Sequence, residues 1–291
     1  MRYSFTFIMT YSTPNNSLKP KVKIGRISYV NVAPVYYLLN GSLKPEWCEI
    51  VSSPPAVLNN MLSMGEIDIS PVSSVAYALH QNNWLLLPDL SISCLGKVMS
   101  VLLAGKLPFE ELNNRKVILT DDSASAAKLI KLLFLKNNIR PVFESVTIHN
   151  PADIDQDADA ALVIGDTALN WEWQTMYVHV RDLGEMWQTL TGLPFVFSVW
   201  AVRKKFAEDR PDAVSEVIDL LLNSKEKGLK NIEKIIIDTS NKLALHKDIC
   251  KKYFNGLFYS LDSSQIKGLN TFFEYLRMEK IISDRVKLSF F

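Results

Sequence analysis

The feature of this sequence that most constrains its fold is an alternation of strand-like and helical segments that stops at Arg203. The run Val22–Ile27 alternates as a strand does, and Ser53 with two following prolines begins a helical segment that Gly65 ends. This rhythm predicts an α/β fold in which helices cover the faces of a sheet. Residues 210–291 differ, because they are mostly helical and offer no second parallel sheet.

The strand and helix candidates form two series that meet near Gly105. Strands are expected at residues 22–27, 47–51, 67–70, 85–87, 90–95, 98–104, 116–120, 142–148, 160–164, 176–180 and 195–202. Helices are expected at residues 31–39, 53–65, 71–79, 123–136, 182–191, 211–237 and 262–281, with a short helix that begins at 166.

The order of these elements predicts two lobes joined by two crossings. Because the helical tail cannot build a sheet of its own, the simplest arrangement returns the chain to its first domain and packs the tail there. The chain then crosses between the lobes near Ala104 and near Ser198, which makes a clamp with a cleft at a double hinge. The expected parts are a disordered extension at 1–21, a first lobe at 22–103 plus 199–291, and a second lobe at 104–198.

The net charge is close to zero, which limits the partners that this chain can bind. The sequence holds 32 lysines and arginines against 31 aspartates and glutamates, so its formal net charge is +1. A protein that binds the phosphate backbone normally shows a basic surplus or stripe. No apolar run approaches the roughly 20 residues that cross a bilayer. We therefore expect neither a nucleic acid nor a membrane as partner.

Cysteines and histidines are scattered and form no known motif. Cys48, Cys94 and Cys250 are odd in number and form no CxxC pair, so we expect them reduced and buried in a cytoplasmic protein. No HExxH motif or Cys/His cluster predicts a metal site, and no glycine-rich phosphate loop predicts a nucleotide cofactor. Thr6 and Thr10 interrupt the short apolar patch at the start, which favours a loose extension over a signal peptide.

Two predicted helices begin in short runs of small hydroxyl residues, each directly after a strand. One run is Ser70–Ser74 and the other is Thr120–Ala126. The N–H groups at a helix N-terminus lack partners and carry partial positive charge, so they bind carboxylates. Either run alone is most simply a helix cap. Two runs, one in each predicted lobe, indicate a cleft for an anionic ligand.

Further candidate residues lie where predicted strands end, which is where open α/β sheets bind their ligands. Ser28 and Asn31 follow the first strand, and Asn31 offers both a donor and an acceptor, with a capping role equally open. Gly165 and Asp166 follow another buried strand. For Asp166 a helix cap is the simpler interpretation, and an acid or base in the cleft is the alternative. Ser100 interrupts an apolar strand. Its simpler interpretation is a buried hydroxyl that has a hydrogen-bond partner, and the alternative is a contact in the cleft.

Four segments of the sequence carry a resemblance to a known enzyme family. They are GRISYVNVAP at 25–34, GEID at 65–68 with PVSSVAY at 71–77, LVIGDTAL at 162–169, and DLG at 182–184 with GLPFVF at 192–197. With these segments the chain resembles the chorismate dehydratases of menaquinone biosynthesis, the first enzymes of the futalosine pathway. The resemblance extends over residues 22–285.

The resemblance implies the fold of type II periplasmic binding proteins and a reaction without a cofactor, the removal of water from chorismate to give 3-[(1-carboxyvinyl)oxy]benzoate. It implies that Asn31 is the residue most closely tied to catalysis and that the substrate's own enolpyruvyl carboxylate serves as the base. The segment at 122–126 departs from the family's usual wording. The residues expected to bind substrate are Ser73, Ser74, Ser123, Ala124 and Ser125 at its carboxylates, with Ser28, Ser100, Gly165 and Asp166 as further contacts.

Two other functions are open at this stage. The sister enzyme of the same pathway, which splits cyclic dehypoxanthinyl futalosine to a dihydroxynaphthoate, shares the fold and the small residues at the helix starts. The segments Ser28–Asn31 and Ile164–Asp166 favour the dehydratase. A non-enzymatic solute-binding protein or ligand sensor would use the same clamp to bind a small anion without chemistry.

Overall fold

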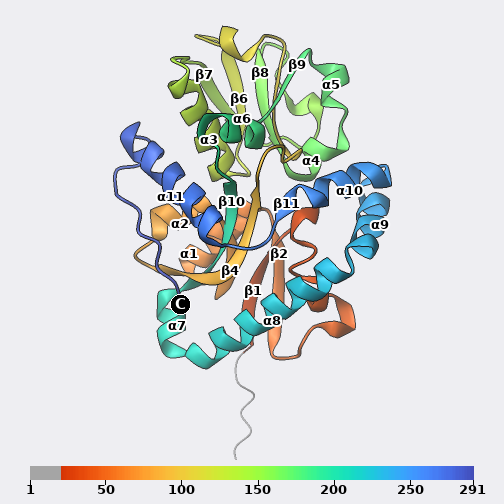
Figure 1. The fold of residues 1–291 in the computed structure, drawn as a ribbon, viewed down its shortest axis with the longest axis vertical. Helices are drawn as coiled ribbons and strands as arrows, with labels where there is room; N and C mark the ends of the chain where they lie inside the picture. Colours follow the sequence, from red (N-terminus) through yellow and green to blue (C-terminus); the bar gives the residue numbers. More distant parts are fainter. Residues whose placement is uncertain (1–20) are drawn as a thin grey trace, which may run out of the picture.

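The computed structural model describes residues 21–291, which form two lobes, each built around its own sheet (Figure 1). The strand order is β11-β4-β10-β3-β1-β2 in the six-stranded sheet of the first lobe and β7-β6-β8-β5-β9 in the five-stranded sheet of the second. Residues 1–20, and with them nearly all of the expected extension, lie outside the described residues.

The first lobe is a mixed sheet covered by most of the helices. Its strands are β1 (Val22–Ile27), β2 (Cys48–Ser53), β3 (Ile69–Ser73), β4 (Trp84–Cys94), β10 (Phe195–Arg203) and β11 (Leu257–Phe258). Strand β1 pairs in parallel with β2 and β3, whereas β10 is antiparallel to β3 and β4. The helices are α1 (Pro55–Met64), α2 (Ser74–His80), α7 (Lys204–Asp209), α8 (Pro211–Lys230), α9 (Ile232–Leu243), α10 (Lys247–Asn255) and α11 (Ser263–Met278), with 3-10 turns η1 (Val30–Val32), η2 (Tyr37–Leu39) and η3 (Gly41–Leu43).

The second lobe repeats the pattern on a smaller scale. Its strands are β5 (Val101–Gly105), β6 (Lys116–Thr120), β7 (Val142–Val146), β8 (Ala160–Ile164) and β9 (His179–Asp182). Strand β6 is parallel to β7 and β8, and β5 is antiparallel to β8 and β9. The helices are α3 (Ala124–Lys136), α4 (Gly165–Asn170), α5 (Trp173–Met176) and α6 (Leu183–Thr191), with 3-10 turns η4 (Phe109–Glu111) and η5 (Pro151–Asp153).

The helix expected at 31–39 is wrong, because the segment after β1 forms the separate 3-10 turns η1 and η2 instead. Most of its backbone bonds are local, and the Leu38 amide donates to Ser224 Oγ of α8 at 2.9 Å. Helix α8 also approaches so closely that a Cβ on Gly228 would lie 2.2 Å from the carbonyl oxygen of Pro34. Tertiary packing therefore overrides the local helical pattern here.

Two strand predictions also change. The candidates at 85–87 and 90–95 are one strand, β4, in which the register against β10 shifts around Pro88 and Asp89. Asp89 has a φ of 52°, so Pro88 and Asp89 form a bulge within the strand and not a loop between two strands. The strand expected at 176–180 is observed later, as β9 at His179–Asp182, because Met176 is the last residue of α5.

The two crossings between the sheets lie at residues 95–100 and 192–194, where one sheet's strand ends and an element of the other region begins. The expected lobe boundaries after residues 103 and 198 therefore each fall inside a strand, β5 and β10. Both strands are buried almost throughout, so each completes its sheet without a break.

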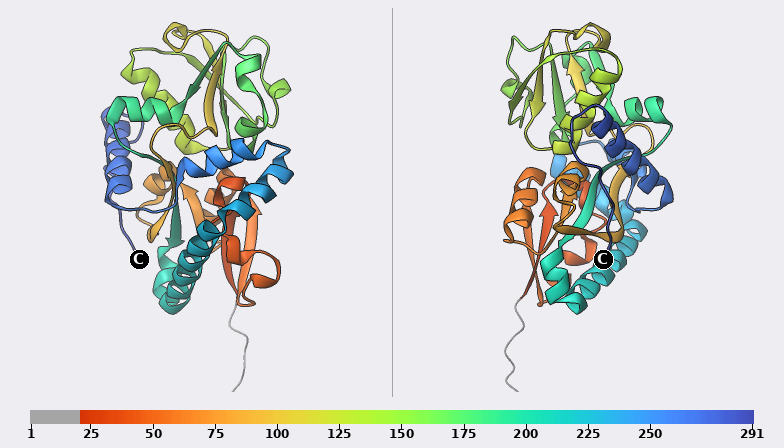
Figure 2. Two further views of the ribbon diagram at one scale, coloured as in Figure 1. Left: turned by 45° about the vertical axis from the view of Figure 1, so that its right-hand side comes forward. Right: turned by 90° about the vertical axis from the view of Figure 1, so that its left-hand side faces the viewer.

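The helical tail wraps the first lobe and reaches the second (Figure 2). Helix α8 packs on η2 and β4, and α11 packs on β10 and α2 and also contacts α3 of the second lobe. At that contact Lys136 Nζ pairs with Glu279 Oε1 at 2.7 Å. Within residues 21–291, no helix combines the length and the apolar character needed to span a bilayer.

Candidate active site

A small cavity of about 50 Å³ lies where the two lobes meet, and we call it the inner cavity. It is lined from both lobes, and the predicted site residues among its walls are Asn31, Ser73, Ser100, Ser123 and Gly165. The predicted residues Ser28, Ser74, Ala124, Ser125 and Asp166 lie outside this lining.

Asn31 lines the inner cavity and carries an unsatisfied polar atom. Its Oδ1 is buried and has no hydrogen-bond partner within residues 21–291. Asn31 lies inside η1, whose N-cap is Tyr29, so the alternative of a capping role is wrong. Buried polar atoms almost always have a partner, and an orphan at a cavity wall fits an acceptor reserved for a ligand.

The two hydroxyl-rich helix starts meet each other across the lobes. Ser73 and Ser123 are the caps of α2 and α3, since their hydroxyl groups accept the amides of Ala76 at 3.1 Å and Ala126 at 3.2 Å. The next hydroxyls bond between lobes, because Ser74 Oγ lies 2.8 Å from Ser125 Oγ. The N-terminus of α2 in the first lobe therefore lies against the N-terminus of α3 in the second lobe, and the two lobes are in contact there.

Asp166 acts on the other lobe and not on its own helix. The N-cap of α4 is Ile164, which makes no side-chain cap, so the capping interpretation of Asp166 is wrong. Its Oδ1 accepts the amide of Val30 at 3.0 Å, and its Oδ2 lies 3.5 Å from Lys242 Nζ. Burial raises the pKa of the Asp166 carboxyl, while the Val30 amide and Lys242 lower it. Asp166 thus fixes the start of the turn that carries Asn31.

Tyr29 closes the cavity against Gly165. A Cβ on Gly165 would lie 2.7 Å from the Tyr29 ring, and the φ of Gly165 is +63°, which favours glycine. The Tyr29 hydroxyl donates to Asp122 Oδ2 of the other lobe at 3.4 Å. Burial, and then the neighbouring carboxylates of Asp122 and Asp166, raise the pKa of the Tyr29 phenol, so it stays a neutral donor.

Ser100 is a hydrogen-bonded buried hydroxyl, and it also lies at the inner cavity. Its Oγ accepts the Tyr253 hydroxyl at 3.2 Å. Ser100 precedes β5 and does not interrupt it, which corrects the expected strand start at 98. Its carbonyl accepts the amide of Gly165 at 2.8 Å and so holds that glycine at the cavity wall.

Sequence reasoning missed Ser198, which lines the inner cavity from the middle of β10. The sequence does carry a signal for this residue, because Ser198 is the single hydroxyl residue in the otherwise apolar segment 195–202. Ser100 gives the same kind of signal beside its own strand. Ser198 is the register partner of Ser73 in β3, so both hydroxyl residues enter from neighbouring strands of the first sheet.

The inner cavity is too small for a ring-bearing ligand as it stands. Ligand pockets usually measure roughly 300–1,000 Å³, whereas this cavity measures about 50 Å³. The contacts Tyr29–Asp122, Val30–Asp166 and Ser74–Ser125 all join the lobes. These contacts must open to admit a ligand and can re-form around it, as the hinge of a clamp allows.

Ligands for a metal ion do not gather in the described part of the chain. Within residues 21–291, no group of three or more histidine, cysteine, aspartate or glutamate residues is placed to hold a metal. Cys48, Cys94 and Cys250 are free thiols and buried, as expected.

Residues 22–278 match the model of a protein family described as menaquinone biosynthesis. The chain belongs to this menaquinone biosynthesis family. A curated chorismate dehydratase of Thermus thermophilus is 31% identical over 274 residues, which are 89% of this chain and 96% of the relative. A curated 1,4-dihydroxy-6-naphtoate synthase of Streptomyces coelicolor is 28% identical over 153 residues, 51% of this chain and 53% of the relative. The resemblance seen in the sequence is thereby confirmed.

Solved structures show the fold of this family member. A protein from Archaeoglobus fulgidus superposes with a TM-score of 0.70 at 18% identity, covering 90% of this chain and 98% of that one. The alkanesulfonate-binding protein SsuA from Xanthomonas axonopodis superposes with a TM-score of 0.69 at 14% identity, covering 92% and 96%. The predicted periplasmic-binding-protein-like α/β fold is confirmed.

Proposed function

We propose that this chain is a chorismate dehydratase, a hydro-lyase that converts chorismate to 3-[(1-carboxyvinyl)oxy]benzoate and water. The similarity to the Thermus thermophilus enzyme over nearly the whole of both chains supports this activity. The observation that carries it in the structure is the orphaned Oδ1 of Asn31 at a cavity between two lobes. The naphthoate synthase is the weaker candidate, since that similarity covers about half of each chain.

The reaction depends mainly on how the substrate is positioned, because its products are favoured. Loss of a ring proton together with the ring hydroxyl leaves an aromatic ring and one water, so the products are strongly favoured. A site that closes on the substrate, fixes its geometry and excludes bulk water suits such a step. In our proposal the buried amide oxygen of Asn31 accepts a hydrogen bond from the ring hydroxyl and so orients the C–O bond that breaks. The substrate's own enolpyruvyl carboxylate takes the ring proton and passes it to the departing hydroxyl, which leaves as water.

The carboxylates of chorismate suit the two helix starts. When the lobes separate, Ser74 and Ser125 lose their mutual hydrogen bond, and two helix N-termini then face the cleft. Each presents backbone N–H groups and hydroxyl donors, which favour an anion. Two carboxylates on one substrate match one helix start in each lobe, and binding of both draws the lobes together.

The direct test is to incubate the purified protein with chorismate and to follow products by mass. We expect a product lighter than chorismate by one water. Chorismate that binds tightly and returns unchanged would favour a binding protein. Turnover of cyclic dehypoxanthinyl futalosine, with chorismate untouched, would favour the sister enzyme.

Replacement of Asp166 tests whether it positions the Asn31 turn. In Asp166→Ala the Val30 amide loses its acceptor in the closed state, which costs about 1–3 kcal/mol. We expect KM for chorismate to rise roughly tenfold, equivalent to about 1.4 kcal/mol, with a smaller change in kcat. Asp166→Asn keeps an oxygen acceptor and should restore most of the affinity. An equal loss of kcat in both variants would instead make Asp166 an acid or base.

A further inference from the structure

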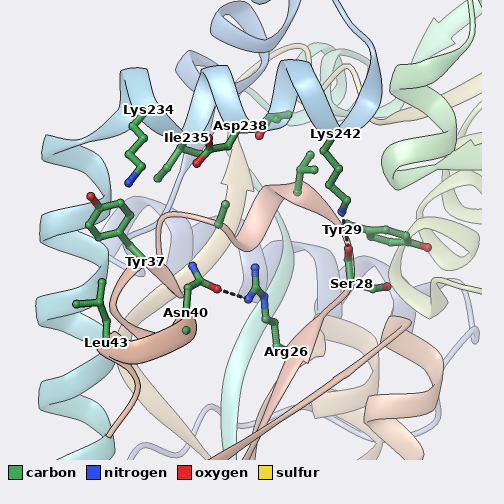
Figure 3. A pocket seen from close by; sticks show the side chains of 14 residues that line it. Arg26, Ser28, Tyr29, Tyr37, Asn40, Leu43, Lys234, Ile235, Asp238 and Lys242 are labelled. Atoms are coloured by element: carbon green, nitrogen blue, oxygen red, sulfur yellow. Dashed lines mark hydrogen bonds between the residues drawn. The ribbon is translucent and has the colours of Figure 1, made fainter.

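A second cavity of about 460 Å³ lies between α9 and the segment that follows β1, and we call it the outer pocket (Figure 3). Tyr29 lines both the outer pocket and the inner cavity, so it forms the wall between them. In Figure 3, Lys234, Asp238 and Lys242 descend from α9, and Arg26 rises from the opposite wall. The outer pocket has the volume of a small-molecule site, and the proposed reaction does not use it.

Arg26 holds a fixed and uncompensated positive charge in this pocket. Its guanidinium donates to Asn40 Oδ1 at 2.6 Å, and its central carbon lies 5.5 Å from the centre of the Tyr36 ring. Its electrostatic neighbour within residues 21–291 is Tyr36 and not a carboxylate, and residues 1–20 contain no aspartate or glutamate. Arg26 is half-buried, and this burial lowers the pKa of its guanidinium. A guanidinium carries five N–H donors, so most of the fork is available.

The rest of the lining adds positive charge and apolar walls. Lys234, Lys242 and the single carboxylate Asp238 all line the pocket from α9, and Arg26 on the opposite wall adds to the excess of positive charge. Lys242 pairs with Asp166 at 3.5 Å and donates to the Ser28 carbonyl oxygen at 3.3 Å, and its side chain is 56% exposed. The apolar and aromatic part of the lining is Ala33, Tyr37, Leu43 and Ile235.

We propose that the outer pocket is a second ligand site, which binds a small carboxylic acid with a flat ring. The carboxylate would accept two parallel hydrogen bonds from the planar guanidinium of Arg26, which matches the carboxylate's geometry. The ring would lie against Tyr37 and Ile235, where it removes apolar surface from water. The outer pocket is distinct from the Asn31 cavity, and binding there requires no turnover.

The test is a titration of isotope-labelled protein with benzoate, followed by two-dimensional amide NMR. We expect saturable shifts of the amides of Ile235, Thr239 and Lys242. Arg26→Gln should weaken benzoate binding at least tenfold. The matched control is Arg115→Gln, which removes the same charge from an exposed site on the second lobe and should leave binding unchanged.

Several outcomes would overturn the second site. Shifts confined to amides around Ser73 and Ser123 would place benzoate in the inner cavity, and equal weakening by Arg115→Gln would show a general charge effect. Acetate, which lacks the ring, should bind at least tenfold more weakly, and equal binding would refute the ring contact. If Arg26→Gln fails to fold, Lys234→Gln should still weaken binding about threefold, and no change would count against the proposal. Because benzoate needs no reaction, failure of the dehydratase activity would not produce any of these results.

Discussion

Asn31→Ala is expected to remove nearly all dehydration of chorismate while the protein stays folded. The amide oxygen is buried at the inner cavity and has no partner within the described residues, so its loss costs the fold no hydrogen bond. In the proposed reaction, however, it holds the departing hydroxyl. Removal of one preorganised group at a reacting oxygen typically lowers kcat by roughly 10²–10³-fold. We expect kcat to fall by that order, with KM changed only a few-fold, in a steady-state assay of chorismate loss.

The control for Asn31→Ala is Asn270→Ala, an exposed asparagine on α11 that should leave kcat and the melting temperature unchanged. Asn31→Asp is a sharper variant, because it keeps the shape of the side chain but adds a negative charge in a buried place. Full turnover in Asn31→Ala would contradict the assignment of Asn31. A loss of turnover that accompanies a large fall in melting temperature would point to a structural role.

The sequence predicted the parts of the site that depend on local pattern. Ser73 and Ser123 could be recognised because a small hydroxyl residue between a strand and a helix is the usual N-cap, and both hydroxyls do cap their helices. Asn31 and Gly165 could be recognised because each follows a strand of an α/β sheet. These rules act over a few residues, so the sequence alone carries them.

The parts that the sequence could not predict depend on contacts between distant segments. Asp166 was expected to cap its own helix, but its partner is the Val30 amide, 136 positions earlier in the chain. The segment at 31–39 has a helical pattern, yet it forms 3-10 turns that pack against Ser224 and Gly228 of α8. Such partners follow from how the lobes and the tail pack, which single-segment patterns do not encode.

The structural prediction with the largest effect concerns Asp182, which pins the first crossing between the lobes. Its carboxylate accepts the amides of Val98 at 3.0 Å and Met99 at 2.7 Å, both in the crossing segment. It also caps α6 through the amides of Gly184 at 2.9 Å and Glu185 at 3.2 Å. One buried carboxylate thus accepts hydrogen bonds from four backbone amides.

Asp182→Ala leaves these four donors without their acceptor. The surroundings are tightly packed, since a Cβ on Gly184 would lie 2.4 Å from the Gly96 carbonyl oxygen. The two crossing amides left unpaired cost about 1–3 kcal/mol each, and the lost cap, which covers the other two amides, costs about 1 kcal/mol, so we expect the free energy of unfolding to fall by at least about 4 kcal/mol. For a chain of this size that corresponds to a fall in melting temperature on the order of 10 °C. Asp262→Ala is the matched control, because Asp262 is exposed and caps α11 through the amides of Ser264 and Gln265, with no hydrogen bond to a crossing segment within residues 21–291. It should cost about 1 kcal/mol. Equal losses in the two variants, measured by urea denaturation, would show that Asp182 is an ordinary helix cap and that the crossing is held by the packing of β5 and β10 alone.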